Sequence, residues 1–356
     1  MNQSGVMQRW PATVMALLVL AAASYSFSPR PLPPFPETAV RADGLLLNGI
    51  AQRGERIVAV GELGHVLIAD DPSGPWRKAS VTPQRGSALT RVIFLDDEQL
   101  LAVGQDGWIV RSGDRGETWT EVNFEEDGTE PLLAISGPHD GVIHAVGGFG
   151  LYRVSTDLGQ TWTARSINTV PDDDAPAVDS SNPFAMMDDG IGDRHLNALV
   201  ALPDGRLLLA GESGVLARSD DGGENWQALD AIYPGSFFGA LTLPDGVLVF
   251  GMRGHVFRSL DGGDNWQQAT TPGTISLFGG AVQDDGRIVL VGASQTLIVS
   301  EDGGQTFHTL GDSGRSLLAD VLPIEGGWLT VGESGVRKQT EASVTARLKT
   351  RAGEGS

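Results

Sequence analysis

A short glycine pattern recurs through this chain and constrains its fold more than any other feature. It first occurs as Val60-Gly61-Glu62-Leu63-Gly64. The first glycine of six later copies stands at Gly104, Gly147, Gly211, Gly251, Gly292 and Gly332. Seven copies at a period of about forty residues are typical of a repeat architecture.

Apolar runs flank each copy, as in Val247-Leu-Val-Phe250 before one of them and Val256-Phe257 after it. Short β-branched runs that are separated by glycines predict strands joined by a tight hairpin. We expect the glycines to occupy positive φ, which is costly for residues with side chains. Only the sixth copy lacks the second glycine, where Gln295 stands instead.

A second motif keeps a fixed distance from the first. Its full form is Ser112-x-Asp114-x-Gly116-x-x-Trp119, and this pattern is the Asp-box, or BNR repeat, of β-propellers. We expect each aspartate to accept backbone N–H bonds, the glycine to be left-handed, and the aromatic ring to pack between neighbouring sheets. The aspartates and aromatics are Asp71 and Trp76, Asp114 and Trp119, Asp157 and Trp162, Asp221 and Trp226, Asp261 and Trp266, and Asp302 and Phe307.

These repeats predict an all-β chain, with a single seven-bladed β-propeller of four-stranded antiparallel blades over 37–340. In blade 4, strands are expected at about 197–202, 206–210, 215–218 and from Trp226. Blade 7 has no Asp-box, so its fourth strand must come from elsewhere. We favour Glu37–Arg41, with Ser343–Leu348 as the alternative, and we expect 341–356 to form a C-terminal tail.

The N-terminus predicts export. An apolar run over Ala12–Ala23 follows Arg9 and ends in small residues, so 1–27 is either a signal peptide or an uncleaved membrane anchor. The proline-rich segment 28–36 is expected to be an extended linker. The predicted location is the periplasm, with the propeller soluble or tethered to the inner membrane.

Composition narrows the classes of function. The formal net charge of −20, from 45 acidic and 25 basic residues, disfavours nucleic acid as a partner. The chain has no cysteine, so disulfides, thiolate zinc sites and cysteine nucleophiles are excluded. The six histidines show no metal-binding spacing. We therefore expect no cofactor and no metal, and we assign no catalytic residue.

One repeat is roughly 22 residues longer than the others, which marks an insertion at 165–194 between blades 3 and 4. It should project over the face that carries the glycine turns. A binding arm or lid and a passive solvated loop are equally good interpretations. Its acidic residues include Asp172, Asp173, Asp174, Asp188 and Asp189.

Glycan-acting enzymes are the alternative class, because sialidases also carry Asp-boxes. Their Phe/Tyr-Arg-Ile-Pro motif is absent, and beyond the leader only Tyr152 and Tyr233 remain as tyrosines. A paired-carboxylate hydrolase needs two acids across a cleft. Glu62 and Glu333 lie in equivalent turns of neighbouring blades and can approach each other, but solvated turn residues are the simpler interpretation. A lectin belongs to the same alternative.

With its leader, seven blades and paired motifs, the chain resembles the photosystem II assembly/stability factor propellers over about 37–340. The resemblance implies a non-enzymatic factor that binds a membrane or periplasmic protein and is otherwise monomeric. Relatives in non-photosynthetic bacteria suggest a transporter of the RND type. The relatives' arginine patch points to Arg91, Arg194 and Arg315. The candidate partner-binding residues are the five insertion aspartates with Glu62, Arg91, Arg194, Glu212, Phe237, Phe238 and Glu333.

Overall fold

The computed structural model describes residues 10–26, 41–126, 128–167, 191–310 and 314–340. Residues up to Thr38 form one unit and residues from Ala39 onward form a second. The described part of the first unit is helix α1 (Trp10–Ser26). No helix in the described ranges combines the length and the apolar character needed to cross a membrane.

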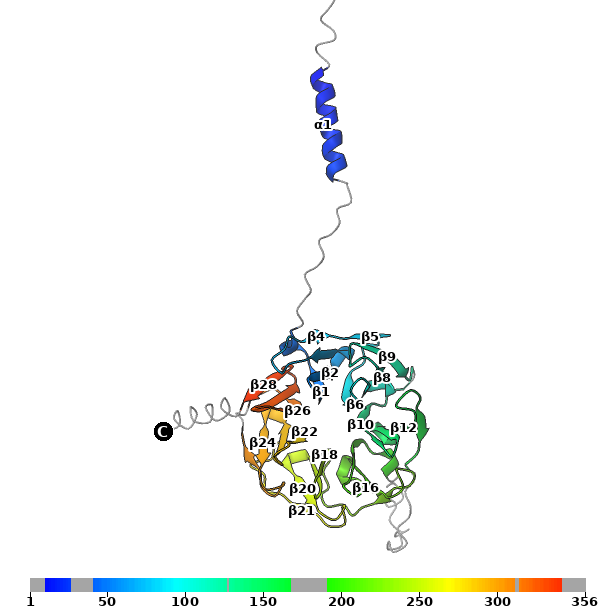
Figure 1. Cartoon of the computed structure of the whole chain (residues 1–356), viewed down its shortest axis with the longest axis vertical. Helices are drawn as coiled ribbons and strands as arrows, with labels where there is room; N and C mark the ends of the chain where they lie inside the picture. Colours follow the sequence, from blue (N-terminus) through cyan, green and yellow to red (C-terminus); the bar gives the residue numbers. More distant parts are fainter. Residues whose placement is uncertain (1–9, 27–40, 127, 168–190, 311–313, 341–356) are drawn as a thin grey trace, which may run out of the picture. The chain divides into compact units, whose positions relative to one another are not determined.

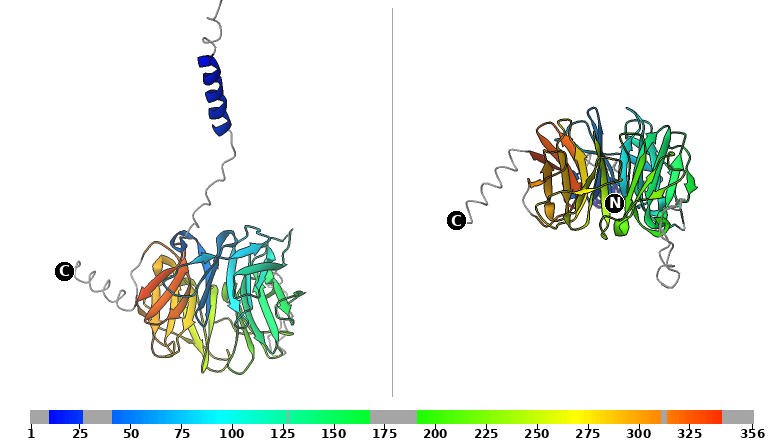
Figure 2. Two further views of the ribbon diagram at one scale, coloured as in Figure 1. Left: turned by 45° about the horizontal axis from the view of Figure 1, so that its top comes forward. Right: turned by 90° about the horizontal axis from the view of Figure 1, so that it is seen from below.

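The second unit is a seven-bladed β-propeller of antiparallel sheets (Figures 1 and 2). Within each blade the strands follow chain order from the central channel outward. The innermost strands are β1 (Leu47–Arg53), β6 (Leu89–Phe94), β10 (Leu132–His139), β14 (Leu196–Ala201), β18 (Phe237–Leu243), β22 (Leu277–Val282) and β26 (Leu318–Ile324). The second strands are β2 (Arg56–Gly61), β7 (Leu100–Gly104), β11 (Val142–Gly147), β15 (Leu207–Gly211), β19 (Gly246–Gly251), β23 (Ile288–Gly292) and β27 (Gly327–Gly332).

The outer strands are shorter. The third strands are β3 (Val66–Ala69), β8 (Ile109–Ser112), β12 (Tyr152–Ser155), β16 (Leu216–Ser219), β20 (Val256–Ser259), β24 (Leu297–Ser300) and β28 (Arg337–Thr340). The fourth strands are β4 (Arg77–Lys78), β9 (Thr118–Asn123), β13 (Thr163–Arg165), β17 (Gln227–Ala228), β21 (Gln267–Gln268) and β25 (His308–Thr309). The fold class is confirmed, and the blade 4 strands lie within about one residue of the predicted bounds.

Two blades depart from the simple pattern. Strand β5 (Ser80–Thr82) leaves blade 1 and pairs in parallel with β9, which gives blade 2 a fifth strand. Blade 7 has three strands among the described residues. Four of the five residues in the favoured closing strand, Glu37–Arg41, and the whole alternative, Ser343–Leu348, lie outside the described ranges. The first and last blades nevertheless meet, since Val336 N donates to Ala42 O at 3.0 Å.

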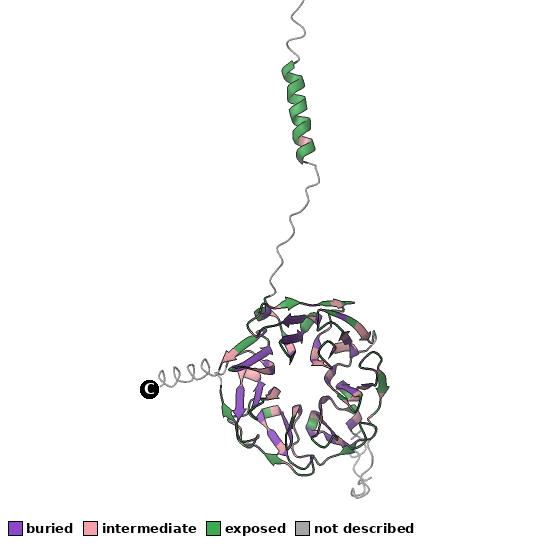
Figure 3. Cartoon of the chain, viewed as in Figure 1, coloured by how far each residue is buried: buried purple, intermediate pink, exposed green. Residues whose placement is uncertain are grey.

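The core lies between the blades, as Figure 3 shows. The second strands are almost wholly buried because both of their faces pack against neighbouring sheets, which explains their continuous apolar runs. The motif aromatics fill these contacts. Trp119, for example, packs with Val58 and Ile68 of the preceding blade. The predicted place of the aromatic ring is therefore confirmed.

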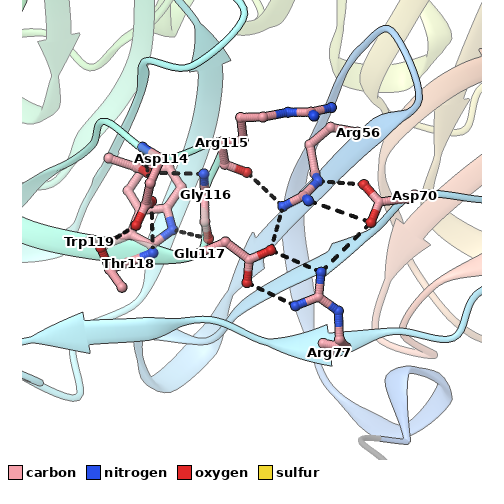
Figure 4. Close-up of polar contacts among 10 residues, drawn as sticks. Arg56, Asp70, Arg77, Asp114, Arg115, Gly116, Glu117, Thr118 and Trp119 are labelled. Carbon is pink, nitrogen blue, oxygen red and sulfur yellow. Dashed lines mark hydrogen bonds and ion pairs between the residues drawn. The ribbon is translucent and has the colours of Figure 1, made fainter.

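The aspartate turns between the third and fourth strands have the expected geometry (Figure 4). In blade 2, Thr118 N donates to Asp114 Oδ1 at 2.9 Å, and Gly116 is left-handed with φ 86°. The hydroxyl of Ser112 accepts Gly116 N–H at 2.9 Å and donates to the carboxylate at 2.8 Å. Local hydrogen bonding thus accounts for the aspartate without any catalytic role.

The same bonds recur in later blades and affect acidity. In blade 3, the hydroxyl and backbone N–H of Thr161 bond to Asp157 and lower the pKa of its carboxyl to about 2. Blade 1 differs because Asp71 accepts the N–H of Ser73 at 2.6 Å and the left-handed glycine comes later, at Gly74. Its aspartate turn is therefore a distinct local structure.

A buried arginine joins blades 1 and 2 (Figure 4). Arg56 Nε donates to Asp70 Oδ1 at 2.7 Å, and its Nη1 donates to Arg115 O of the next blade at 2.8 Å. Glu117 lies 3.2 Å from Arg56 and pairs with Arg77 through two further bonds. Arg218 reaches Gly262 O in the same way between blades 4 and 5. These contacts link neighbouring blades directly.

Candidate functional site

The seven turns between second and third strands lie on one face of the ring, because every blade runs in the same direction. We call it the glycine-turn face. The opposite face carries the aspartate turns. Six of the glycine turns contain a 3-10 segment: η2 (Glu62–Gly64), η3 (Gln105–Gly107), η4 (Gly148–Gly150), η6 (Glu212–Gly214), η7 (Met252–Gly254) and η8 (Ala293–Gln295).

The expectation of positive φ is correct for the second glycine and wrong for the first. Gly64 has φ 65°, and Gln295, which replaces the glycine in the sixth copy, has φ 55°. The first glycine is extended, as at Gly104 with φ −169°. A Cβ on Gly104 would lie closer than 3.0 Å to Ala88 O and to the Cα of Leu89. The first glycine is thus required because the innermost strand of its own blade approaches its backbone.

Among the described residues, two large apolar side chains on this face are markedly more exposed than Leu46 and Ile275, which stand at 39% and 37%. Leu63 and Phe149 occupy the third position of the turns in blades 1 and 3, and their exposed fractions are 62% and 63%. Both have left-handed backbones, with φ 56° and 50°, which costs a bulky residue of the order of 1 kcal/mol or more. The equivalent residues include Ser213 and Ser294. This pair was not among the predicted partner-binding residues, although an apolar residue at that turn position is visible in the sequence.

The predicted glutamates lie on the glycine-turn face, and two of them accept backbone N–H bonds through their carboxylates. Glu212 Oε2 accepts His195 N–H at 3.3 Å, and Glu333 Oε2 accepts Leu317 N–H at 3.0 Å. The backbone N–H of Glu62 bonds to Leu46 O. In the described ranges, no three acidic or histidine side chains gather in a way that would hold a metal ion.

The insertion reaches this face at its C-terminal end. Its described end includes segment η5 (Ile191–Asp193), and Arg194 O accepts Gly150 N–H at 2.9 Å. The ring of His195 meets Phe149 edge-on, with centroids 4.7 Å apart. The predicted aspartates Asp172, Asp173, Asp174, Asp188 and Asp189 lie outside the described residues.

The paired phenylalanines begin β18, the innermost strand of blade 5. Phe237 is fully buried and packs against Val247 and Phe257. Its side chain cannot contact a partner, so that prediction is wrong. Because side chains alternate between the two sides of a strand, Phe238 faces the channel, where the centroid of its ring lies 5.3 Å from that of Phe278.

Polar side chains on the innermost strands satisfy backbone groups of the next blade. Asn48 Nδ2 donates to Leu89 O at 2.9 Å, and Asn197 Nδ2 donates to Phe237 O at 2.7 Å. Arg91, which we predicted for a partner patch, lies in this channel and donates to Asn48 O at 2.9 Å. It lines a cavity with Asp320, and these two are the only charged residues among the described residues that line it.

A buried pair outside the channel has no access to a substrate. His144 Nδ1 lies 2.8 Å from the hydroxyl of Tyr152 in blade 3, and both side chains are buried. Burial lowers the pKa of His144 to about 4 and raises that of Tyr152. The sialidase-like use of Tyr152 as a nucleophile is therefore not supported by its surroundings.

Comparison with known proteins places this architecture among solved propellers. No family model matches the chain, and no curated protein sequence matches it. A structure of YCF48 bound to a D1 peptide is similar, with a TM-score of 0.63 and 15% identity, over 86% of this chain and 97% of that chain. YCF48 from Cyanidioschyzon merolae gives a TM-score of 0.62 and 15% identity, over 86% and 98%.

The extracellular domain of a putative one component system from B. thetaiotaomicron is also similar. Its TM-score is 0.61 at 10% identity, over 85% of this chain and 39% of that chain. What these likenesses share is the propeller fold. The resemblance that the repeats indicated therefore holds for the fold.

Proposed function

We propose that this chain is an exported, non-catalytic propeller that binds a membrane or periplasmic protein and helps to assemble or stabilise it. In this proposal α1 belongs to the export signal or anchor, and the aspartate turns are Asp-box repeats. The observation that carries the proposal is the exposed pair Leu63 and Phe149 on the glycine-turn face. A partner protein that lies across this face would bury both side chains, and burial of exposed apolar surface favours association.

Two further observations support it. A similar propeller, YCF48, has been solved with a bound D1 peptide, which makes a protein partner a reasonable expectation here. The channel cavity offers one carboxylate, Asp320, whereas a glycosidase of the usual kind requires two. Among the described residues that line the cavity there is no second acid to complete such a pair.

The test is crosslinking of the full-length protein in intact cells, followed by mass spectrometry. Leu63→Ser and Phe149→Ser place in these turns the residue that Ser213 and Ser294 already supply at left-handed positions, so the turns should fold. We expect the double variant to lose the crosslinked partner. The matched control is Leu260→Ser, because Leu260 is 56% exposed on the opposite face.

Equal crosslinking by the double variant and the wild type would show that this face does not bind the partner. The enzyme alternative is tested separately with a panel of aryl glycosides. Sustained turnover by the purified protein, abolished by Asp320→Asn, would refute the non-catalytic assignment.

A further inference from the structure

The central channel contains a cavity of about 180 Å³ that the proposed protein-binding role does not use. Nearly all of its lining belongs to innermost strands of blades 2 to 7. Arg91, Asp320, Phe238 and Phe278 give it two opposite charges and two aromatic rings. All four residues are half-buried.

The guanidinium of Arg91 is held on one side and available on the other. Nη1 donates to Asn48 O at 2.9 Å and to Thr90 O at 3.4 Å, and Nη2 makes a long bond of 3.5 Å to Phe278 O. Among the described residues, Nε has no acceptor within hydrogen-bonding distance. The Nε–Nη2 edge can bind a carboxylate through two parallel hydrogen bonds, because Nη2 carries a second N–H besides the one that bonds to Phe278 O. Arg91 is thus anchored in position with its carboxylate-binding edge still available.

Asp320 supplies the opposite charge in the same cavity. Its carboxylate accepts Ile50 N–H at 3.2 Å and Val321 N–H at 2.9 Å, which fixes its orientation. No ion pair within 4 Å joins Asp320 to Arg91, although both are described. Burial raises the pKa of Asp320, and the charge of Arg91 opposes that shift. A cationic group placed beside Asp320 would favour its ionised form.

Most of the remaining wall is apolar, and Asn197 is its one further polar side chain among the described lining residues. The rings of Phe238 and Phe278 lie 5.3 Å apart, and Leu241 and Ile135 extend the same lining. A cavity of this volume holds a molecule of about benzene size or slightly larger. The channel therefore presents a carboxylate-binding edge, a carboxylate and an aromatic wall within the space of one small molecule.

We propose that this cavity binds a free α-amino acid with an apolar side chain. Its carboxylate bonds to the Nε–Nη2 edge of Arg91, its ammonium group bonds to Asp320, and its side chain packs on Phe238 and Phe278. Both charges of the zwitterion are paired, which offsets the loss of their hydration.

The first experiment measures binding of L-valine, L-leucine and L-isoleucine to the full propeller by isothermal titration. We expect saturable one-to-one binding of at least one of them. Its N-acetyl derivative, which lacks the ammonium group, and its amide, which lacks the carboxylate, should each bind about tenfold more weakly or worse. The proposal would be overturned if none of the three amino acids showed saturable binding. It would also be overturned if the N-acetyl derivative bound as tightly as the amino acid, because the ligand would then be the C-terminal end of a peptide chain.

Variants then assign the two charges. Asp320→Asn should weaken binding of the amino acid about tenfold and leave binding of its N-acetyl derivative unchanged. Arg91→Lys should weaken both, because lysine keeps the charge and loses the bidentate edge. A merely structural role of Asp320 would change both ligands alike and would refute the assignment.

The control is Arg253→Gln, since Arg253 is exposed on the glycine-turn face and does not line the cavity. It should bind the amino acid like the wild type. Far-UV circular dichroism and the unfolding midpoint show whether each variant is folded. If a cavity variant does not fold, the comparison of amino acid, N-acetyl derivative and amide on the wild type still decides the proposal.

Discussion

Two buried tryptophans allow the hydrogen bond of an aspartate turn to be separated from the burial of its ring. Trp119 and Trp226 occupy equivalent positions and expose 1% and 0% of their surface. The Nε1 of Trp119 donates to Gly116 O at 2.9 Å, whereas the Nε1 of Trp226 is buried without a hydrogen-bond partner among the described residues. The sixth copy has Phe307 at this position, so phenylalanine fits the turn.

Phenylalanine at either position removes the same part of the indole ring and leaves a similar cavity. Only Trp119→Phe also leaves the buried carbonyl of Gly116 without its donor. A lost buried hydrogen bond of this kind costs about 1 kcal/mol, and up to about 3 kcal/mol where the acceptor stays unsatisfied. Trp119→Phe should therefore destabilise the propeller by about 1 kcal/mol more than Trp226→Phe.

The assay is equilibrium unfolding in urea followed by far-UV circular dichroism, because removal of a tryptophan alters the fluorescence signal. A shift of the urea midpoint reports a change in stability when the m-value, the slope of the free energy of unfolding against urea concentration, is unchanged. If Trp226→Phe proves as destabilising as Trp119→Phe, or more so, the hydrogen bond to Gly116 contributes nothing measurable and the reasoning fails.

Three further predictions use the same assay. Gly104→Ala should lower the free energy of unfolding by about 1–3 kcal/mol, because the new Cβ would meet the backbone at Ala88. In the control Gly273→Ala the new Cβ meets nothing within 4 Å, so the free energy of unfolding should change by no more than about 0.5 kcal/mol. Arg218→Met should cost about 1–3 kcal/mol by leaving Gly262 O without its inter-blade donor at 3.1 Å, and an undiminished midpoint would contradict this role. His144 has a pKa of about 4 in the folded chain, below the ordinary value near 6.5, so the imidazole binds a proton more readily when the chain is unfolded. The contribution of His144 to stability should therefore be full above about pH 6.5 and fall as the pH decreases toward 4. His144→Asn should flatten this pH dependence of the unfolding midpoint.

Much of the architecture can be read from local patterns. The serine, aspartate and glycine of each aspartate turn bond to residues within four positions in the chain, so their geometry is encoded locally. The spacing of the repeats then gives the number of blades. The first glycine of each glycine turn was also identified, but for the wrong reason. Its requirement comes from the innermost strand of the same blade, and only coordinates show that approach.

The residues that line the channel could not be predicted from the sequence. Arg91 and Phe278 are separated by 187 positions, and they meet because the ring closes around one axis. Asp320 and Ile50 are separated by 270 positions and bond for the same reason. Phe237 and Phe238 were grouped because they are adjacent in the chain, yet strand alternation sends one ring into the core and the other into the channel.

The sequence by itself therefore determined the repeat unit, the turn chemistry and the number of blades, because each depends on contacts within a few tens of residues. The tertiary structure decided which side chains face the channel and which stand exposed on the glycine-turn face. Those properties depend on the ring as a whole, since each innermost strand presents its residues to partners from distant blades.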